Sequence, residues 1–390
     1  MSLTDSTVVW LLWAVAVGAF VWTIVSWPKV AGGGWTAVLR RIGHQLAVVV
    51  LAVAALGATL NSQYGWYANW ADLGAGLVGT AQVDQIQAAG AAPSDAAAGH
   101  WSGGDQSGGA TAASPMRDRN LGLVGTPGPN GQYHTYTIRG PVSRVSGQVT
   151  VWFPAAYTSP GASRQGFPVI EAFHGIPGSP AQFSNSLDLG SVLAGQVANG
   201  NIGNAILVMP NFDPRGIDTE CVNGGARAPR MEDWLSKDIP AWVDTHLRVK
   251  VDRGAWATMG FSAGGWCAGM LAMRHPNVFG AAISLGGYFQ PTFEKTYRPF
   301  TSTSAQGREY DMVALARRDP PRIALWIQTS KTDPMSYGTT KELLRIARPP
   351  LSVTADVLTN AGHRMSVWVD LFPQTLHWLG QKIPGFAPVR

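Results

Sequence analysis

Long apolar runs open the chain, and shorter ones recur through its second half. Residues 8–27, VVWLLWAVAVGAFVWTIVSW, carry no charge. A run of about 20 apolar residues crosses a bilayer as a helix. Residues 45–60, QLAVVVLAVAALGATL, form a second run that is followed by the aromatic segment NSQYGWYANW, and it is long enough to span when residues 42–64 are counted. The pattern predicts two transmembrane helices that form a hairpin within residues 1–73.

The distribution of charge predicts how this hairpin is oriented. The connection between the two runs carries Lys29, Arg40 and Arg41 and no acidic residue. Because Lys and Arg are retained on the cytoplasmic side, both ends of the hairpin are expected outside the membrane. A cleavable signal peptide fits poorly, because Asp5 is the one charged residue before the first run. A hairpin buried inside a soluble protein remains the alternative.

A segment of low complexity separates the hairpin from the rest of the chain. Residues 74–120 include AAGAAPSDAAAGHWSGGDQSGGATAASP, which is rich in Ala, Gly and Ser. Its apolar side chains are too few to offset the entropy that is lost on ordering, so we predict a flexible linker. Residues 121–390 then form the third part of the chain.

From residue 121 onward, strand-like runs alternate with helical patterns. HTYTIRG and GQVTVWFP predict two antiparallel strands. Six continuous apolar runs follow, as expected for strands buried on both faces: FPVIEAFHG, NAILVMP, GAWATMGFS, GAAISLGG, RIALWIQTS and SVTADVL. Helical spacing is found in MEDWLSKDIPAWVDTHL, CAGMLAMRHP, TTKELLRIA and MSVWVDLFPQTLHWLGQKI. The alternation predicts an α/β fold, with a mostly parallel sheet and helices on both sides.

A serine between two glycines lies where one of these strands should end and a helix begin. The Gly-x-Ser-x-Gly turn of Gly260, Ser262 and Gly264 is a strained turn that needs small neighbours. The helix that follows directs its free amides at developing negative charge. The motif predicts that Ser262 is a catalytic nucleophile. A Gly-rich turn without a catalytic role is the alternative.

A serine nucleophile needs a general base, and the base needs an acid that orients it. In α/β-hydrolases the three residues follow the order Ser, then Asp or Glu, then His. Asp333 follows the strand RIALWIQTS and His363 follows the strand SVTADVL. Both positions lie after strand ends, where open α/β sheets place their sites, so we predict a triad of Ser262, Asp333 and His363. Other acids and histidines lie within or beside predicted elements and fit less well: Asp319, Glu342, Asp356, Asp370, His275 and His377.

Two backbone N–H groups are predicted to stabilise the oxyanion. One belongs to Ala263, the residue after the nucleophile, and the other to the loop HGIPG, where Gly175 or Ile176 could donate. Pro177 in this loop has no N–H to donate. His174 is expected to shape the loop rather than to transfer protons.

Composition excludes some classes of function. Of the 390 residues, 46% are hydrophobic and only 14% are charged, which agrees with membrane contact or a large core. The net charge is +5, but the Lys and Arg residues are scattered, so no nucleic-acid partner is expected. Cys221 and Cys267 are not spaced as zinc ligands, and the predicted chemistry needs no metal and no cofactor.

At these residues the chain resembles the esterase family of α/β-hydrolases that includes esterase D, feruloyl esterases and the mycobacterial mycolyltransferases. The pieces that carry the resemblance are FHGIPGSP, GFSAGGWCA, TSKTDP and AGHRMSVW. GFSAGGWCA and DTECVNG are also similar to membrane-tethered esterase-like proteins of actinobacteria. The resemblance implies the same triad, and it makes a Cys221–Cys267 disulfide our expectation for a domain outside the membrane. Two reduced thiols are the alternative. The family's mycolyltransferases use Glu as the acid and a cleavable signal, so mycolate transfer is not implied.

The combined pattern predicts a membrane-anchored serine esterase or acyltransferase outside the cytoplasmic membrane. Its substrate would be an ester or acyl donor, with a lipidic one favoured slightly by the membrane tether. Tyr288 and Phe289 could line an acyl pocket, although packing explains them equally well. A catalytically silent envelope-binding module and a serine peptidase are the alternative functions. The oligomeric state is left open.

Overall fold

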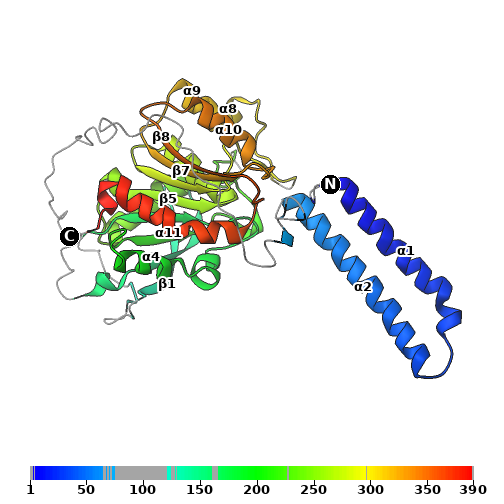
Figure 1. The fold of residues 1–390 in the computed structure, drawn as a ribbon. Coiled ribbons are helices and arrows are strands. Elements are labelled where there is room, and N and C mark those ends of the chain that lie inside the picture. Colours follow the sequence, from blue (N-terminus) through cyan, green and yellow to red (C-terminus); the bar gives the residue numbers. More distant parts are fainter. Residues whose placement is uncertain are drawn as a thin grey trace. The chain divides into compact units, whose positions relative to one another are not determined.

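The computed structural model describes residues 3, 5–64, 67, 70, 73–74, 121–123, 128, 130–159, 166–225, 228–295 and 297–388 (Figure 1). The predicted linker, residues 74–120, lies outside the described residues apart from Gly74. The chain divides into two compact units, which are described separately. The first unit contains the N-terminal helices together with two short segments, Ser330–Pro334 and Thr359–Ser366. The second contains the β-sheet and the helices around it.

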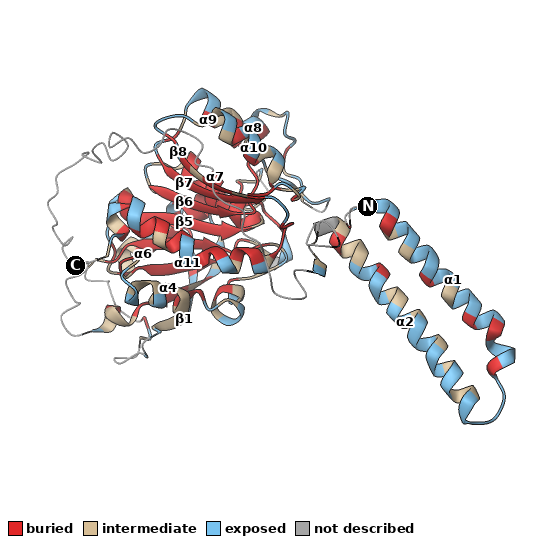
Figure 2. Cartoon of the chain, in the orientation of Figure 1, coloured by how far each residue is buried: buried red, intermediate tan, exposed pale blue. Residues whose placement is uncertain are grey.

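Two long helices, α1 (Ser6–Val30) and α2 (Trp35–Tyr64), form an N-terminal hairpin. Both are long and apolar enough, by length and composition, to cross a membrane. Most of their large apolar side chains are exposed, which Figure 2 shows as pale blue along both helices. The helices are joined across the hairpin by a hydrogen bond from Trp13 Nε1 to Thr59 Oγ1 (3.0 Å). An apolar, exposed surface of this kind is typical of helices that contact lipid.

The connection between the helices is shorter than the sequence indicated. It consists of residues 31–34, and α2 begins at Trp35, so Arg40 and Arg41 lie on the helix rather than in a loop. The reason is local: Gly34 adopts a φ of 115°, which ends the turn, and no proline follows it within α2. The positive charges nevertheless remain near the same end of the hairpin as Lys29.

An eight-stranded sheet forms the centre of the second unit, in the order β1-β2-β4-β3-β5-β6-β7-β8. The β1–β2 and β2–β4 pairs are antiparallel, and the strands from β4 through β3, β5 and β6 to β7 pair in parallel. Ser352 N–H donates to Ile323 O (3.0 Å), which brings the start of β8 beside the start of β7. The strands are β1 (Gln132–Arg139), β2 (Ser146–Phe153), β3 (Val169–Phe173), β4 (Ile206–Pro210), β5 (Trp256–Phe261), β6 (Ala281–Leu285), β7 (Ala324–Ser330) and β8 (Ser352–Leu358).

Helices cover both faces of the sheet (Figure 1). Successive residues of a strand point to opposite faces. Thr258 Oγ1 of β5 donates to Ala268 O of α7 (2.8 Å). Phe261, which points to the other face of the same strand, stacks on Trp368 of α11 (5.5 Å between ring centroids). The helices α7 and α11 therefore cover opposite faces of the sheet. The helices of this unit are α4 (Leu189–Ala198), α5 (Met231–Asp233), α6 (Ile239–His246), α7 (Ala263–Arg274), α8 (Ala305–Glu309), α9 (Met312–Arg318), α10 (Tyr337–Ile346) and α11 (Met365–Lys382).

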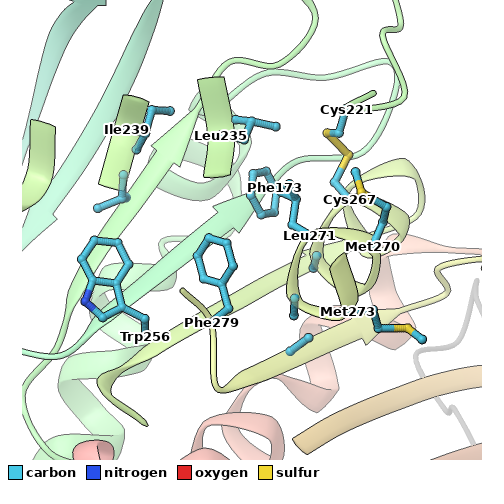
Figure 3. Packing of buried hydrophobic residues seen from close by; sticks show 14 of the residues in the cluster. Phe173, Cys221, Leu235, Ile239, Trp256, Cys267, Met270, Leu271, Met273 and Phe279 are labelled. Carbon is cyan, nitrogen blue, oxygen red and sulfur yellow. A yellow bond between two sulfur atoms is a disulfide. The ribbon is translucent and has the colours of Figure 1, made fainter. Parts of the chain in front are cut away.

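The larger apolar core lies on the α7 face of the sheet. It includes Phe173 of β3, Trp256 of β5 and Leu271 of α7, all buried (Figure 3). The strands themselves are buried along most of their length, as the red strands of Figure 2 show. The continuous apolar runs in the sequence therefore have the expected cause, since their side chains are covered on both faces.

The α/β architecture and the eight predicted strands are confirmed. The four predicted helical segments are confirmed as well, although a π-helical turn, Trp234–Asp238, joins α5 to α6. The sequence pattern did not predict α4, α8 and α9. Two of these are short, and α4 lacks a polar face that would distinguish it from a buried strand.

Candidate active site

Ser262 occupies a strained turn between β5 and α7. β5 ends at Phe261 and α7 begins at Ala263. Ser262 has a φ of 57° and a ψ of −125°, a conformation that a residue with a side chain keeps only where its surroundings hold it. Its N–H donates to Leu285 O (2.9 Å), and its carbonyl oxygen accepts from Trp266 N–H (3.0 Å). This turn has the geometry of a nucleophile elbow.

Two glycines allow this turn to form. A Cβ atom on Gly264 would overlap the carbonyl oxygens of Phe173 and His174, and one on Gly260 would overlap the carbonyl oxygen of Gly264. Only glycine therefore lets the first turn of α7 approach the end of β3. The same close approach brings Ala263 beside the loop that follows β3, where the second oxyanion donor was predicted.

The loop after β3 is shaped by its histidine. His174 is fully buried, its Nδ1–H donates to Gly175 O (2.9 Å), and its ring stacks on Phe212 (4.4 Å between centroids). Burial lowers the pKa of His174 to about 4, so the ring is neutral near pH 7. Gly175 packs against the Phe261 ring so closely that a Cβ would lie 2.9 Å from it. Gly175 and Ile176 are thus held near the start of α7, while a neutral, buried His174 is unsuited to proton transfer.

Asp333 and His363 form a buried hydrogen-bonded pair. Asp333 Oδ2 lies 2.8 Å from His363 Nδ1, and the two residues are 2% and 4% exposed. A carboxylate in this position makes Nδ1 the protonated nitrogen and leaves Nε2 as the acceptor. This is the arrangement that a general base needs.

The loops that carry this pair are tied to each other. Ala361 N–H donates to Ser330 Oγ (2.9 Å), and Gly362 N–H donates to Thr332 Oγ1 (3.3 Å). Gly362 has a φ of 61°, which favours glycine directly before His363. These bonds between the loop after β7 and the loop after β8 keep Asp333 and His363 within hydrogen-bond distance of each other.

The rival histidines have other partners. His275 Nε2 lies 2.8 Å from a carboxylate oxygen of Glu232, and His377 Nε2 lies 2.8 Å from Gln381 Nε2. Asp356 is buried within β8, and burial raises its pKa to about 6. The remaining rival acids lie in or at the end of helices: Asp319, Glu342 and Asp370.

A buried carboxylate that the sequence did not single out explains the position of His275. Glu232 accepts hydrogen bonds from Arg274 Nε (2.7 Å), His275 Nε2 (2.8 Å) and Tyr310 OH (2.5 Å). Burial alone would raise the pKa of Glu232, but the hydrogen bond from His275 and the charge of Arg274 outweigh it and lower the pKa to about 2. Because its partners are distant in sequence, no local motif could have indicated this network. These bonds attach the end of α7 to Glu232 of α5.

Tyr288 and Phe289, predicted as weak candidates for pocket lining, are both buried. Tyr288 OH donates to the Glu220 carboxyl group (2.5 Å), and its ring stacks on Trp266 (5.9 Å between centroids). Phe289 N–H donates to Thr339 Oγ1 (3.1 Å). Burial, together with the nearby charge of Asp218, raises the pKa of Glu220 well above its usual value. These contacts are those of packing residues, and a role in acyl binding stays a prediction.

A disulfide joins Cys221 to Cys267 of α7, shown in Figure 3 as the yellow bond between two sulfur atoms. Glu220 and Cys221 both have a positive φ, 51° and 54°. Trp266 Nε1 also donates to Glu220 O (2.8 Å), so the loop after β4 is attached to α7 by a covalent bond and a hydrogen bond. These attachments lie one turn along α7 from Ser262.

The structure thus brings together two groups of predicted residues. Asp333 is hydrogen-bonded to His363. Ala263 lies beside the loop of Gly175 and Ile176. Within the part of the chain that the structure describes, no group of three or more His, Cys, Asp or Glu side chains is arranged to hold a metal ion.

Comparisons with known proteins agree with this architecture. A family model described as "Putative esterase" matches residues 146–376. An uncharacterized protein of Corynebacterium glutamicum is 26% identical over 140 residues, which is 36% of this chain and 32% of that protein. The chain therefore spans about a third of the length of this curated relative.

Three solved structures are similar in fold. A ferulic acid esterase has a TM-score of 0.54 at 17% identity and covers 65% of this chain and 98% of its own. An S-formylglutathione hydrolase from Agrobacterium tumefaciens has a TM-score of 0.54 at 16% identity, over 66% and 97% of the two chains. A fluorophosphonate-binding serine hydrolase of Staphylococcus aureus has a TM-score of 0.52 at 17% identity, over 64% and 98%. At these identities the likeness concerns the fold alone.

Proposed function

The chain belongs to the esterase family whose model it matches, and we propose that it is a serine esterase or acyltransferase with Ser262 as the nucleophile. The observation that carries the proposal is the buried hydrogen bond between Asp333 and His363. It supplies an oriented general base in a chain that also has a serine in an elbow turn. A structural serine would not require that strained conformation.

The proposed reaction follows from these groups. His363 Nε2 takes the proton of Ser262 while the hydroxyl oxygen attacks the ester carbonyl carbon. Asp333 holds the imidazole and stabilises the imidazolium that forms. The negative oxygen of the tetrahedral intermediate is stabilised by the N–H of Ala263 and by the N–H of Gly175 or Ile176. His363 then protonates the leaving alcohol, and the acyl group remains bonded to Ser262 until water or another alcohol accepts it.

We further propose that α1 and α2 cross the cytoplasmic membrane and hold the catalytic domain outside the cytoplasm. The length and apolar composition of the two helices support the spanning. The positive charges of Lys29, Arg40 and Arg41 at one end of the hairpin support the orientation. A disulfide suits an oxidising compartment. A reporter enzyme fused after residue 390 should be active only on the outer side, and activity in the cytoplasm would overturn the orientation.

The proposed substrates are esters or acyl donors of the cell envelope, with lipidic ones favoured because the enzyme is attached to a membrane. Hydrolysis and acyl transfer use the same machinery and differ in how well the site excludes water. No nucleic acid, metal or cofactor takes part in the proposed reaction. The partners are the substrate and the membrane.

The proposal is tested by turnover of p-nitrophenyl esters of increasing acyl length, with and without an added alcohol or sugar acceptor. We expect turnover by the wild type and none above background by Ser262→Ala. A new ester product in the presence of the acceptor would identify a transferase. Peptide anilides serve as the contrast: faster cleavage of anilides than of esters would indicate a peptidase. Turnover by neither wild type nor Ser262→Ala would indicate a catalytically silent binding module, whereas equal turnover by both would show that Ser262 is not the nucleophile.

A further inference from the structure

The loop that carries His363 belongs to the same compact unit as the two N-terminal helices. That unit contains Thr359–Ser366 and Ser330–Pro334, so it includes both members of the Asp333–His363 pair. Arg364 follows His363 directly and is only 6% exposed. Its guanidinium carbon lies 5.5 Å from the centre of the Tyr67 ring. Tyr67 comes shortly after the end of α2 at Tyr64.

Tyr67 is itself held in place by a buried asparagine of α2. Asn61 Oδ1 accepts from Tyr67 N–H (2.7 Å), and Asn61 Nδ2 donates to Tyr67 O (2.8 Å). The same Nδ2 donates to Leu3 O (3.1 Å), which lies just before α1. One side chain therefore joins the start of the first helix to the segment after the second. The backbone of Tyr67 is therefore held at this end of the hairpin, which is the end opposite Lys29.

A guanidinium over a tyrosine ring is an attractive arrangement. The ring face is negative, and a cation within about 6 Å of the centroid is attracted to it, more strongly when both groups are removed from water. Tyrosine is also enriched at the boundary between membrane and water. These properties make the Tyr67–Arg364 contact suited to holding the His363 loop at the membrane surface.

We propose that Asn61 and Tyr67 position the His363 loop at the outer end of α2, so that the site acts on ester groups of amphiphilic lipids at the outer surface of the bilayer. This inference rests on the esterase activity and the two membrane spans proposed above. Tyr67 is a positioning residue that acts through Arg364. It makes no contact with a reacting atom in this account, so its loss should matter for substrates held in the membrane and not for esters dissolved in water.

The experiment uses the full chain reconstituted in phosphatidylcholine vesicles. The two substrates are p-nitrophenyl palmitate within the bilayer and p-nitrophenyl acetate in the surrounding water. Tyr67→Leu removes the ring face, Tyr67→Phe keeps it, and Asn61→Ala releases the backbone of Tyr67. Trp35→Leu is the matched control, because Trp35 is an exposed aromatic residue at the opposite end of α2.

We expect Tyr67→Leu to lower kcat/KM for the palmitate about three- to thirty-fold, the range of a cation–π contact, and to leave the acetate within about twofold of the wild type. Asn61→Ala should do the same, whereas Tyr67→Phe and Trp35→Leu should change neither ester. An equal fall for both esters in Tyr67→Leu, or no fall in either, would overturn the proposal. A wild type that turns over neither ester would instead overturn the proposed esterase itself.

Discussion

Asp333 Oδ2 accepts the Nδ1–H of His363 at 2.8 Å, and both side chains are shielded from water. If this bond sets the tautomer of the base, Asp333→Asn should be far more damaging to catalysis than to folding. The asparagine amide can donate to Nδ1, which places the ring proton on Nε2 and removes the acceptor that Ser262 needs. We expect kcat to fall by about 10⁴-fold while the melting temperature stays near the wild-type value.

The control for this substitution is Asp370→Asn, which changes an exposed aspartate of α11 in the same way. It should leave kcat unchanged. Steady-state kinetics and thermal melting of the two variants make the comparison. If Asp333→Asn keeps more than a tenth of the wild-type kcat, Asp333 does not orient the base.

Gly264 is expected to be indispensable for the geometry of the nucleophile turn. In Gly264→Ala the new methyl group would overlap the backbone of Phe173 and His174, so β3 and α7 must separate. We expect loss of activity and a destabilisation of about 1–3 kcal/mol, the usual range for forcing extra volume into a packed site.

Gly195→Ala provides the contrast. Gly195 lies within α4, and nothing lies within 4 Å of the position that its Cβ would occupy. Since alanine favours a helix over glycine, this variant should be about 0.5–1 kcal/mol more stable and fully active. Denaturant unfolding measures both changes. A stable and active Gly264→Ala protein would show that the close approach is not needed.

The disulfide between Cys221 and Cys267 should contribute to stability. It closes a loop with a sequence separation of 46, and a cross-link of this size typically stabilises a fold by about 2–4 kcal/mol. Cys221→Ser should lower the denaturant midpoint, and reduction of the wild type should lower it by a similar amount. Reduction should have no further effect on the variant. A wild-type midpoint that does not respond to reductant would contradict this account of the cross-link.

The sequence was sufficient for those features that depend on local pattern. Each buried strand produces a continuous apolar run, and the turn at Ser262 requires flanking glycines, so both are visible in the residues themselves. The pairing of Asp333 with His363 could be predicted because both residues follow the ends of strands, where side chains from neighbouring loops come together.

Features that depend on distant residues could not be predicted in this way. Glu220 and Glu232 are buried because Tyr288 and Arg274, far along the chain, bond to them. The contact between Tyr67 and Arg364 likewise joins segments that have no common pattern. The position of Arg40 on a helix escaped prediction because the length of the turn depends on the conformation of a few glycines.

Glu171 should make the stability of the fold depend on pH. Its carboxyl group is fully buried in β3, on the same face as Val169 and Phe173, and neither oxygen has a hydrogen-bond partner in the described residues. Burial raises the pKa of Glu171 well above its usual value. The folded protein therefore holds this proton more tightly than the unfolded chain does.

The stabilisation from this proton is complete below the unfolded pKa, near 4.5, and is lost as the pH rises above it towards the folded pKa. Glu171→Gln removes the titration, so the stability of the variant relative to the wild type should rise with pH by at most about 1.4 kcal/mol per unit. Denaturant unfolding of both proteins between pH 4.5 and pH 8 tests this. A stability difference that is constant across that range would contradict a raised pKa for Glu171.

The central claim is that Ser262 is the nucleophile that His363 activates. A fluorophosphonate probe reacts covalently with an activated serine, and trypsin cleavage after Arg253 and Arg274 would release a peptide in which Ser262 is the one serine. After reduction and alkylation of Cys267, mass spectrometry should find the phosphonyl adduct on this peptide in the wild type. The adduct should be absent from Ser262→Ala, and labelling of His363→Ala should be far slower. Undiminished labelling of Ser262→Ala, with the adduct on another peptide, would contradict the claim.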